Sequence, residues 1–100
     1  MLPKKYRNKI FCCDNLTLTR ELPDECIDLI PTSPPYNQNR GITGAFGTGS
    51  YDKYDDLIDE KVYRKRVIRR LSECVRVMKP SASMFIVIAQ RAIKRELVWP

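Results

Sequence analysis

The sequence predicts an α/β fold that forms half of a doubly wound parallel sheet, and three observations support this prediction. Short apolar segments begin near residues 10, 26 and 84, and segments with helical periodicity lie between them. The resulting order is strand, helix, strand, long loop, helix and strand, an alternation typical of a parallel sheet with flanking helices. A chain of 100 residues and 11.7 kDa provides one small domain at most, so we expect a single, partial domain over residues 1–100.

The first predicted strand is the apolar segment Ile10–Cys13, which Asp14 and Asn15 close as a polar turn. Asn15 or Thr17 can then cap a short, leucine-rich helix that ends near Pro23. We expect this strand to be buried, because its four residues are all apolar.

The second predicted strand is Cys26–Ile30. Pro31, Pro34 and Pro35 are expected to end it, because proline has no N–H to donate to a sheet ladder. Residues 37–53 contain all four glycines and predict a long, mobile loop. The glycines match neither a phosphate-binding loop, since no Gly-Lys-Ser/Thr follows, nor the spacing of a dinucleotide-binding motif.

A helical pattern runs from Tyr54 to about Met78 and has one apolar stripe. The stripe consists of Leu57, Ile58, Val62, Ile68, Leu71, Val75 and Met78. The same helix has seven basic residues: Lys61, Arg64, Lys65, Arg66, Arg69, Arg70 and Arg76. These form either a solvated outer face or a surface that contacts phosphates.

The last third of the chain begins with a predicted break at Lys79–Ala82. The continuous apolar segment Met84–Ile88 predicts a strand that is buried on both faces, as in a parallel sheet. Residues Arg91–Trp99 are expected to begin another helix.

The charge balance is compatible with a polyanionic partner. Lys and Arg total 18 against 12 Asp and Glu, which gives a net charge of +6 and a pI near 9.3. Such a surplus also occurs in proteins that never bind nucleic acid. The longest apolar run, Met84–Ala89, is far below the ~20 residues that cross a bilayer, and the basic N-terminus lacks the apolar stretch of a signal peptide. We therefore expect a cytoplasmic protein without a membrane span.

The chain has no histidine, which excludes a Ser-His-Asp triad, a Cys-His pair and a histidine-containing zinc site. Its four cysteines include no Cys-x-x-Cys pair, so no metal site is expected. We expect buried, reduced thiols.

The segment that carries chemistry is Ser33-Pro34-Pro35-Tyr36, at the carboxyl end of a predicted strand, where open α/β sheets bind ligands. Two successive prolines stiffen the backbone, remove two N–H donors and keep Ser33 extended. A hydroxyl and carbonyl oxygens then lie beside an aromatic ring. Acceptors of this kind suit the exocyclic amine of a nucleobase, because bonds from its N–H groups would free the nitrogen lone pair. The ring can stack on a base that has left the duplex.

These residues resemble motif IV of the amino-methylating DNA methyltransferases, which use S-adenosylmethionine to modify adenine N6 or cytosine N4. The family signature is Asp/Ser/Asn-Pro-Pro-Tyr/Phe. The run Leu22–Ile30 is similar to the family's "LPD-x-S-V-D-L-I", and Glu73–Pro80 followed by Met84–Ile86 is similar to "E-C-x-R-V-L-K-P-G-G" and the next strand. The matches cover roughly residues 10 to 90. The resemblance implies a partial Rossmann-like, S-adenosylmethionine-dependent methyltransferase fold.

The resemblance also implies roles for individual residues. Ser33 and the Pro34 carbonyl would accept hydrogen bonds from the target amine, Pro35 would stiffen the turn and Tyr36 would stack on the base. Ser33 would also border the methyl donor. Asp14 would contact the adenosine part of the cofactor, or would act only as a turn or helix N-terminal aspartate.

Serine in the first motif position favours cytosine N4 in this family, whereas aspartate favours adenine N6. Tyr51 and Tyr54 either line the base pocket or pack in the core. Methylation at cytosine C5 is disfavoured, because it needs a cysteine nucleophile in a Pro-Cys dipeptide and the chain has none.

The chain departs from the family pattern at four places. Ser81–Ala82 replaces Gly-Gly, which we expect to stiffen a turn that normally uses positive φ. Pro31 replaces an apolar or aromatic residue, and Cys13 replaces glycine. The Phe-x-Gly-x-Gly cofactor loop is absent from the chain.

Together these features predict a fragment of a DNA cytosine-N4 methyltransferase that is inactive alone. S-adenosylmethionine would be the methyl donor and double-stranded DNA the substrate. Half a sheet leaves apolar surface uncovered, so we expect a complementing polypeptide or self-association. The alternatives are one subunit of a split methyltransferase, or a non-catalytic remnant that binds only DNA or a partner chain.

Overall fold

The computed structural model describes residues 1–35, 37, 58–88, 91–93 and 96–98. These belong to two compact units: unit 1 contains Met1–Thr32 and Arg66–Phe85, and unit 2 contains Ser33–Lys65 and Ile86–Pro100. Apart from Asn37, the loop predicted at 37–53 lies outside the described residues. The expectation of a single domain stays a prediction.

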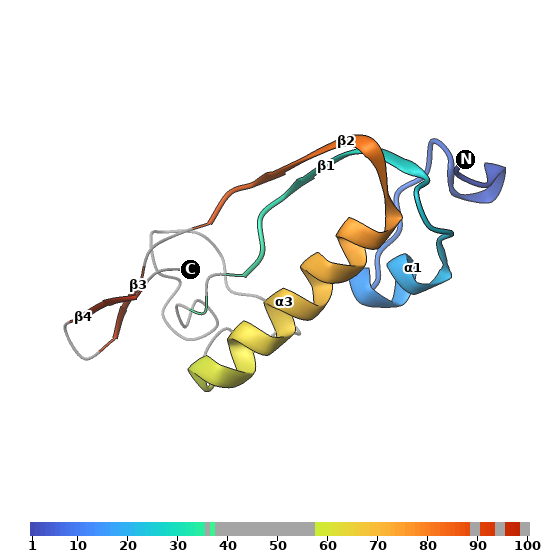
Figure 1. The fold of residues 1–100 in the computed structure, drawn as a ribbon. Helices are drawn as coiled ribbons and strands as arrows, with labels where there is room; N and C mark the ends of the chain where they lie inside the picture. The colour runs from blue at the N-terminus through green and yellow to red at the C-terminus, as the bar shows by residue number, and fades with distance from the viewer. Residues whose placement is uncertain (36, 38–57, 89–90, 94–95, 99–100) are drawn as a thin grey trace. The chain divides into compact units, whose positions relative to one another are not determined.

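Seven helical or strand elements are described (Figure 1). In chain order they are η1 (Lys4–Tyr6), α1 (Asn15–Glu21), β1 (Ile27–Thr32), α3 (Glu60–Val77), β2 (Met78–Ile86), β3 (Arg91–Ile93) and β4 (Glu96–Val98).

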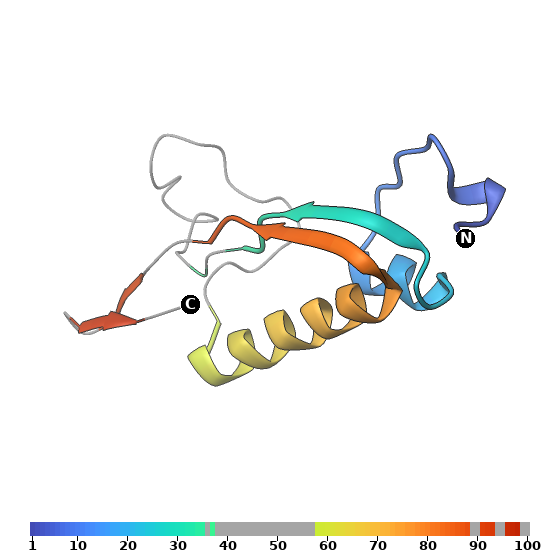
Figure 2. The same ribbon diagram turned by 45° about the horizontal axis from the view of Figure 1, so that its top comes forward.

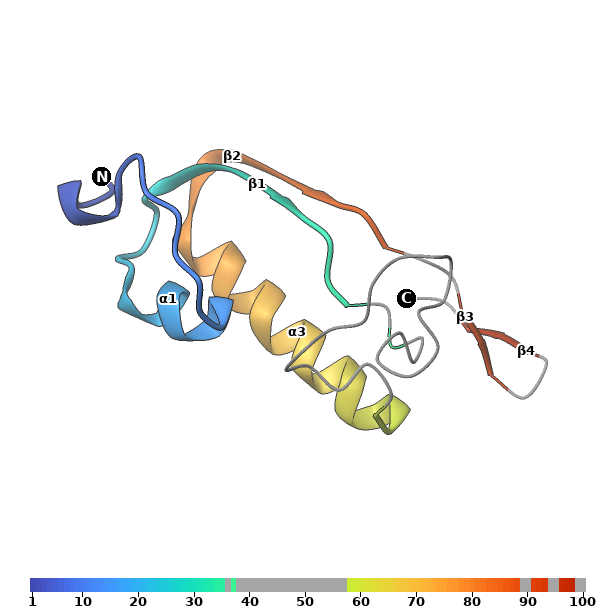
Figure 3. The same cartoon turned by 180° about the vertical axis from the view of Figure 1, so that it is seen from behind.

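The predicted strand-helix-strand unit is confirmed. Strands β1 and β2 pair in one sheet, and both run in the same direction (Figures 1 and 2). Helix α1 and the C-terminal part of α3 lie on the same face of this sheet, also when it is seen from behind (Figure 3). A parallel pair needs a crossover connection, and α3 provides its helical part.

The core of unit 1 lies where α3 ends and β1 begins. Leu22, Cys26 and Val77 are buried together, and half-buried residues such as Ile27 and Ile30 pack against them. The Cys26 N–H donates to the Val77 carbonyl at 2.8 Å. The start of β1 is therefore tied to the last residue of α3, immediately before β2.

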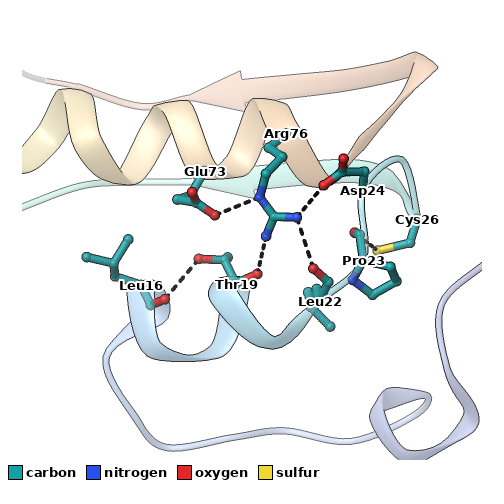
Figure 4. A network of polar contacts seen from close by, with 8 residues as sticks. All are labelled: Leu16, Thr19, Leu22, Pro23, Asp24, Cys26, Glu73 and Arg76. Atoms are coloured by element: carbon teal, nitrogen blue, oxygen red, sulfur yellow. Dashed lines mark hydrogen bonds and ion pairs between the residues drawn. The ribbon is translucent and has the colours of Figure 1, made fainter.

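Arg76 connects the elements around this core (Figure 4). Its guanidinium donates to the backbone carbonyls of Thr19 and Leu22 at 2.7 and 3.0 Å, and to the carboxylates of Asp24 and Glu73. The Leu22 carbonyl follows the last residue of α1, and the Thr19 carbonyl, in the last turn, also accepts from the Leu22 N–H at 3.1 Å. Hydrogen bonds to Asp24 and then Glu73 raise the pKa of Arg76 above its ordinary value. Arg76 therefore holds the end of α1 and the turn before β1 against α3.

The prediction of a buried strand at Ile10–Cys13 is wrong. The structure assigns no strand there, and Ile10, Phe11, Cys12 and Cys13 are exposed. A strand needs a neighbour for its backbone hydrogen bonds, and none of the described residues pairs with this segment. The expectation of four buried thiols therefore holds only for Cys26 and Cys74.

Strand β1 is longer than predicted, because it continues through Pro31 to Thr32. The Cys26 N–H points to the chain just before β2, so alternation along the strand places the nitrogen of Pro31 on the opposite edge. Within the described sheet that edge has no neighbour, so the missing N–H of Pro31 removes no ladder bond.

The break predicted at Lys79–Ala82 is also wrong, because β2 begins at Met78 and passes through this segment. Ser81–Ala82 therefore lie in a strand and not in a turn. Lys79 forms an ion pair with Asp28 of β1 at 2.9 Å, which adds a contact between the two strands. The predicted burial of Met84–Ile88 on both faces is wrong as well, since Phe85 and Val87 are each 64% exposed.

Helix α3 is confirmed but begins at Glu60 and not near Tyr54, and residues 54–57 lie outside the described ones. Its buried residues are Tyr63, Cys74 and Val77, whereas Val62, Ile68 and Val75 of the predicted stripe are exposed. The helix has apolar residues on more than one face. Val77, which immediately precedes β2, is the α3 residue in the core cluster of unit 1.

The helix predicted at Arg91–Trp99 is wrong: β3 and β4 form an antiparallel pair in which Arg91 lies opposite Val98 and Ile93 opposite Glu96. A short helix without a side-chain cap is marginal in water.

Two further properties concern only the described part of the chain. No helix in it is both long and apolar enough to cross a membrane. No group of three or more Cys, Asp or Glu side chains in it is arranged to hold a metal ion.

We expect Arg76→Ala and Arg76→Lys both to lower the urea midpoint of unfolding, measured by circular dichroism. A lysine ammonium cannot reproduce the planar fork that serves four acceptors. The matched control is Arg69→Ala on the same helix, because Arg69 is exposed and makes no ion pair within the described residues. Equal midpoints for the Arg76 and Arg69 variants would contradict the role given to Arg76.

Candidate base-binding site

The candidate site begins where β1 ends. Ser33 follows Thr32, the last residue of the strand, and is exposed, while Pro34 and Pro35 are half-buried. We call Ser33–Pro35 the diproline shelf. Its place at the carboxyl end of a parallel strand agrees with the sequence prediction. Tyr36, Tyr51 and Tyr54 lie outside the described residues.

The shelf is bonded to α3 through Tyr63. The Tyr63 hydroxyl donates to the Pro35 carbonyl at 2.6 Å, and the Tyr63 side chain is only 3% exposed. A buried tyrosine hydroxyl needs a hydrogen-bond partner, and the Pro35 oxygen is one. None of the described residues donates to the Pro34 carbonyl. The two proline carbonyls therefore differ, because Tyr63 engages only the second.

Asn37 makes a second connection just beyond the shelf. Its side-chain oxygen accepts from the Ile58 N–H at 2.9 Å, and its side-chain nitrogen donates to the Ile58 carbonyl at 3.0 Å. Asn37 has φ of 57°, in the left-handed region that asparagine tolerates better than most residues. One side chain therefore satisfies both backbone groups of Ile58.

The segment that receives these bonds is itself well fixed. Asp59 Oδ2 accepts from the N–H groups of Lys61 at 3.0 Å and Val62 at 3.4 Å, as an N-cap does. The Tyr63 N–H donates to the Asp59 carbonyl at 2.9 Å. This cap explains why α3 begins at Glu60, and it gives Tyr63 a fixed backbone.

Asp14, the candidate contact for the cofactor, lies in unit 1 and is the N-cap of α1. Its Oδ1 accepts from the Leu16 N–H at 2.8 Å, and its Oδ2 pairs with Arg70 at 2.8 Å. The hydrogen bond from Leu16 and then that from Arg70 lower the pKa of Asp14 below its ordinary value. The alternative role as a helix N-terminal aspartate is thus observed, and both carboxylate oxygens already have a partner.

The basic side chains of α3 fall into two groups. Arg64 pairs with Glu60, Arg70 with Asp14, and Arg76 with Asp24 and Glu73. The other group has no ion pair within the described part of the chain and consists of Lys61, Lys65, Arg66 and Arg69. These four exposed residues either form a solvated outer face or are candidates for contact with an anion.

The chemistry available at the shelf is acceptance of hydrogen bonds. Prolines have no N–H, so the shelf offers carbonyl oxygens and one hydroxyl to a ligand that donates. Cys74 lies in unit 1, where burial and then Glu73 raise the pKa of its thiol above its ordinary value. The oxygens of the shelf can accept hydrogen bonds from an amine.

Sequence reasoning missed Tyr63 and Asn37. Tyr63 could have been recognised as a residue that contacts another segment, because the hydroxyl of a tyrosine on the buried side of a helix needs a hydrogen-bond partner. Asn37 directly follows the motif, but nothing local indicates that its partner is Ile58, 21 residues away.

Comparison with known proteins identifies the family of the chain. The family model described as "DNA methylase", of the N6 and N4 type, matches residues 27–99. The chain is 35% identical over 83 residues to the type II methyltransferase M.BglII of Bacillus subtilis. The aligned residues cover 83% of this chain and 20% of that protein. It is 30% identical over 82 residues to the type II methyltransferase M.BamHI of Bacillus amyloliquefaciens, 78% of this chain and 16% of that protein.

A third relative is the DNA adenine methyltransferase YhdJ of Escherichia coli K12, which is 31% identical over 87 residues, 84% of this chain and 26% of that protein. The chain thus spans about a quarter or less of the length of these relatives.

We expect Asp14→Ala to lower the free energy of unfolding by about 0.5–2 kcal/mol, the usual effect of losing an N-cap. Asp14→Asn keeps the cap and loses only the charge, so its effect at pH 7 should be smaller. Because folding lowers the pKa of Asp14 below 3.8, its charge stabilises the fold above that pH, and the stabilisation is lost as pH falls through the folded pKa. Urea unfolding of both variants at pH 7 and pH 3 measures this. An unchanged difference between wild type and Asp14→Asn at the two pH values would contradict the charged role.

Proposed function

Because this chain belongs to the N6/N4 DNA methylase family, we propose that it forms the base-binding part of a DNA methyltransferase acting on cytosine N4. The observation that supports the proposal most is the diproline shelf, with an exposed Ser33 and a Pro35 carbonyl held by Tyr63. This leaves the Pro34 carbonyl as the backbone acceptor without a donor among the described residues. Together with the Ser33 hydroxyl it can accept from both N–H groups of an exocyclic amine.

In the proposed reaction the residues of this chain bind and orient the amine. The amine of a nucleobase is a poor nucleophile, because its lone pair is delocalised into the ring. Two acceptors on the shelf would favour a tetrahedral nitrogen and so localise that lone pair. Tyr36 would stack on the everted base, a contact worth roughly 1–3 kcal/mol. Most of the catalytic effect would come from positioning and exclusion of water.

The family uses S-adenosylmethionine, which supplies an activated methyl group when bound. We propose Ser33 and Asp14 as its contacts in this chain. The fit is incomplete, because both oxygens of Asp14 already accept hydrogen bonds and the family's Phe-x-Gly-x-Gly loop is absent from the sequence. In the proposed enzyme a further segment would hold most of the donor.

The choice of cytosine rests on Ser33 in the first motif position, as the family resemblance implies. The alternative is adenine N6, which the similarity to an adenine methyltransferase supports. The substrate in either case would be double-stranded DNA, with Lys61, Lys65, Arg66 and Arg69 as candidate phosphate contacts.

Exposed apolar side chains support the proposed need for another polypeptide. Leu29 of β1 is 54% exposed and Phe85 of β2 is 64% exposed, although both lie in a parallel sheet. Parallel sheets are normally covered on both faces. We propose that the rest of a methylase fold, which makes up most of each relative, covers this surface as a complementing chain. Self-association and a non-catalytic remnant are the competing possibilities.

The first test is methyl transfer from labelled S-adenosylmethionine to duplex DNA, with nucleosides identified by mass spectrometry. We expect no transfer by the chain alone and N4-methylcytosine once a polypeptide with the Phe-x-Gly-x-Gly loop and a recognition region is added. Methylated adenine would overturn the choice of base. Transfer by the chain alone would overturn the need for a partner, and no transfer in either mixture would identify a remnant.

The second test is Ser33→Ala in the complemented enzyme. Loss of one acceptor for an amine that gains positive charge should lower kcat by about tenfold to a hundredfold. Ser83→Ala, which changes an exposed serine of β2, is the matched control and should leave turnover unchanged. Unchanged turnover in Ser33→Ala would rule out the role of its hydroxyl.

A further inference from the structure

We propose that Tyr63 and Asn37 are positioning residues that fix the direction of the acceptors on the diproline shelf. This inference rests on the proposed function, since it concerns how the same site is held ready for an amine. Both residues belong to unit 2, as do Ser33–Pro35 and Ile58, so all contacts in the argument lie within one compact unit.

Tyr63 selects which proline carbonyl stays available. Its hydroxyl engages the Pro35 oxygen at 2.6 Å. Successive carbonyls in an extended diproline point in different directions and the prolines restrict rotation about φ. Holding the Pro35 carbonyl therefore restricts the direction of the Pro34 carbonyl, because the peptide plane and φ of Pro35 are fixed and only ψ of Pro35 can still rotate between the two groups. Without the hydrogen bond from Tyr63, the Pro34 carbonyl would be free to take more directions.

Asn37 holds the other side of the motif. Its two bonds to Ile58 join the chain after the shelf to the residue before the Asp59 cap of α3. Its positive φ turns the backbone at this point, and the side-chain amide pairs with Ile58 as a neighbouring strand would. Positions 35 and 37 are thus each held by a separate contact to the segment Ile58–Tyr63.

The two contacts are independent in the atoms they use, so each can be removed alone. Tyr63→Phe keeps the buried ring and removes only the hydroxyl. Asn37→Gly keeps the positive φ accessible and removes both side-chain bonds. The matched control is Tyr6→Phe, which also removes a tyrosine hydroxyl bond, that from Tyr6 to Glu21 in unit 1.

The first measurement needs no methyl transfer and uses nuclear magnetic resonance on the full chain. Tyr63→Phe should shift the Pro35 carbonyl carbon and change the signals of Ser33 and Pro34. Asn37→Gly should speed hydrogen exchange of the Ile58 amide by up to roughly tenfold. Tyr6→Phe should leave all these signals unchanged. Unaltered Ser33 and Pro34 signals in both variants would overturn the positioning role.

The second measurement is steady-state methyl transfer by the complemented enzyme. Tyr63→Phe and Asn37→Gly should each lower kcat by roughly three- to tenfold, with KM for DNA and for the methyl donor unchanged. A role in folding alone would reduce the active fraction, which a thermal melt detects, without disturbing the Ser33 signal. Wild-type kcat in both variants would overturn the inference. If wild type transfers no methyl group while the resonance changes occur, the proposed function fails and the positioning role stands.

Discussion

The structure of unit 1 depends on the guanidinium of Arg76. Its four acceptors come from the end of α1, from the turn before β1 and from α3 itself, so one side chain determines how these three segments meet. The backbone bonds from Glu25 to Arg76 and from Cys26 to Val77 then place the first residues of β1 beside the start of β2. The diproline shelf follows the last residue of β1.

The chemistry of the site follows from what proline lacks. Without N–H groups the shelf cannot donate through its prolines, and the hydroxyl of Ser33 adds a third polar oxygen to two carbonyls. The Tyr63 hydroxyl donates to one of those carbonyls, and the side chain of Asn37, the residue that follows the motif, bonds to both backbone groups of Ile58. The Pro35 carbonyl is thus engaged within the protein, whereas no described residue donates to the Pro34 carbonyl. In the proposed site a nucleobase amine, with two N–H groups, would donate to the Pro34 carbonyl and to the Ser33 hydroxyl.

Local sequence patterns predicted the parts of the fold that depend on local interactions. The period of α3 and the apolar segments Cys26–Ile30 and Met84–Ile88 predicted the strand-helix-strand unit, although the observed elements have other bounds. The motif predicted that Ser33 follows the end of β1. The exposure of Ile10 and Phe85 could not be predicted in this way, because burial depends on which other layers cover a segment. The continuation of β1 through Pro31 depends on which edge of the strand has a neighbour.

The contacts that hold the site were beyond sequence reasoning for a different reason. Tyr63 and Pro35 are 28 residues apart, and Asn37 and Ile58 are 21 apart. Helical and strand periods relate residues only a few positions apart, so they could not predict contacts over these separations. The two runs that resemble the methyltransferases, Leu22–Ile30 and Glu73–Pro80, were recognised separately. In the structure Arg76 bonds to Leu22 and Asp24, and Lys79 to Asp28.

The central claim is that the shelf accepts hydrogen bonds from the amine of an everted base. The most direct measurement is an experimental structure of the complemented protein with duplex DNA that contains one unpaired cytosine. The account predicts the cytosine N4 atom about 3 Å from both the Pro34 carbonyl oxygen and the Ser33 hydroxyl. A cytosine bound elsewhere, or a shelf covered by the added polypeptide, would contradict it.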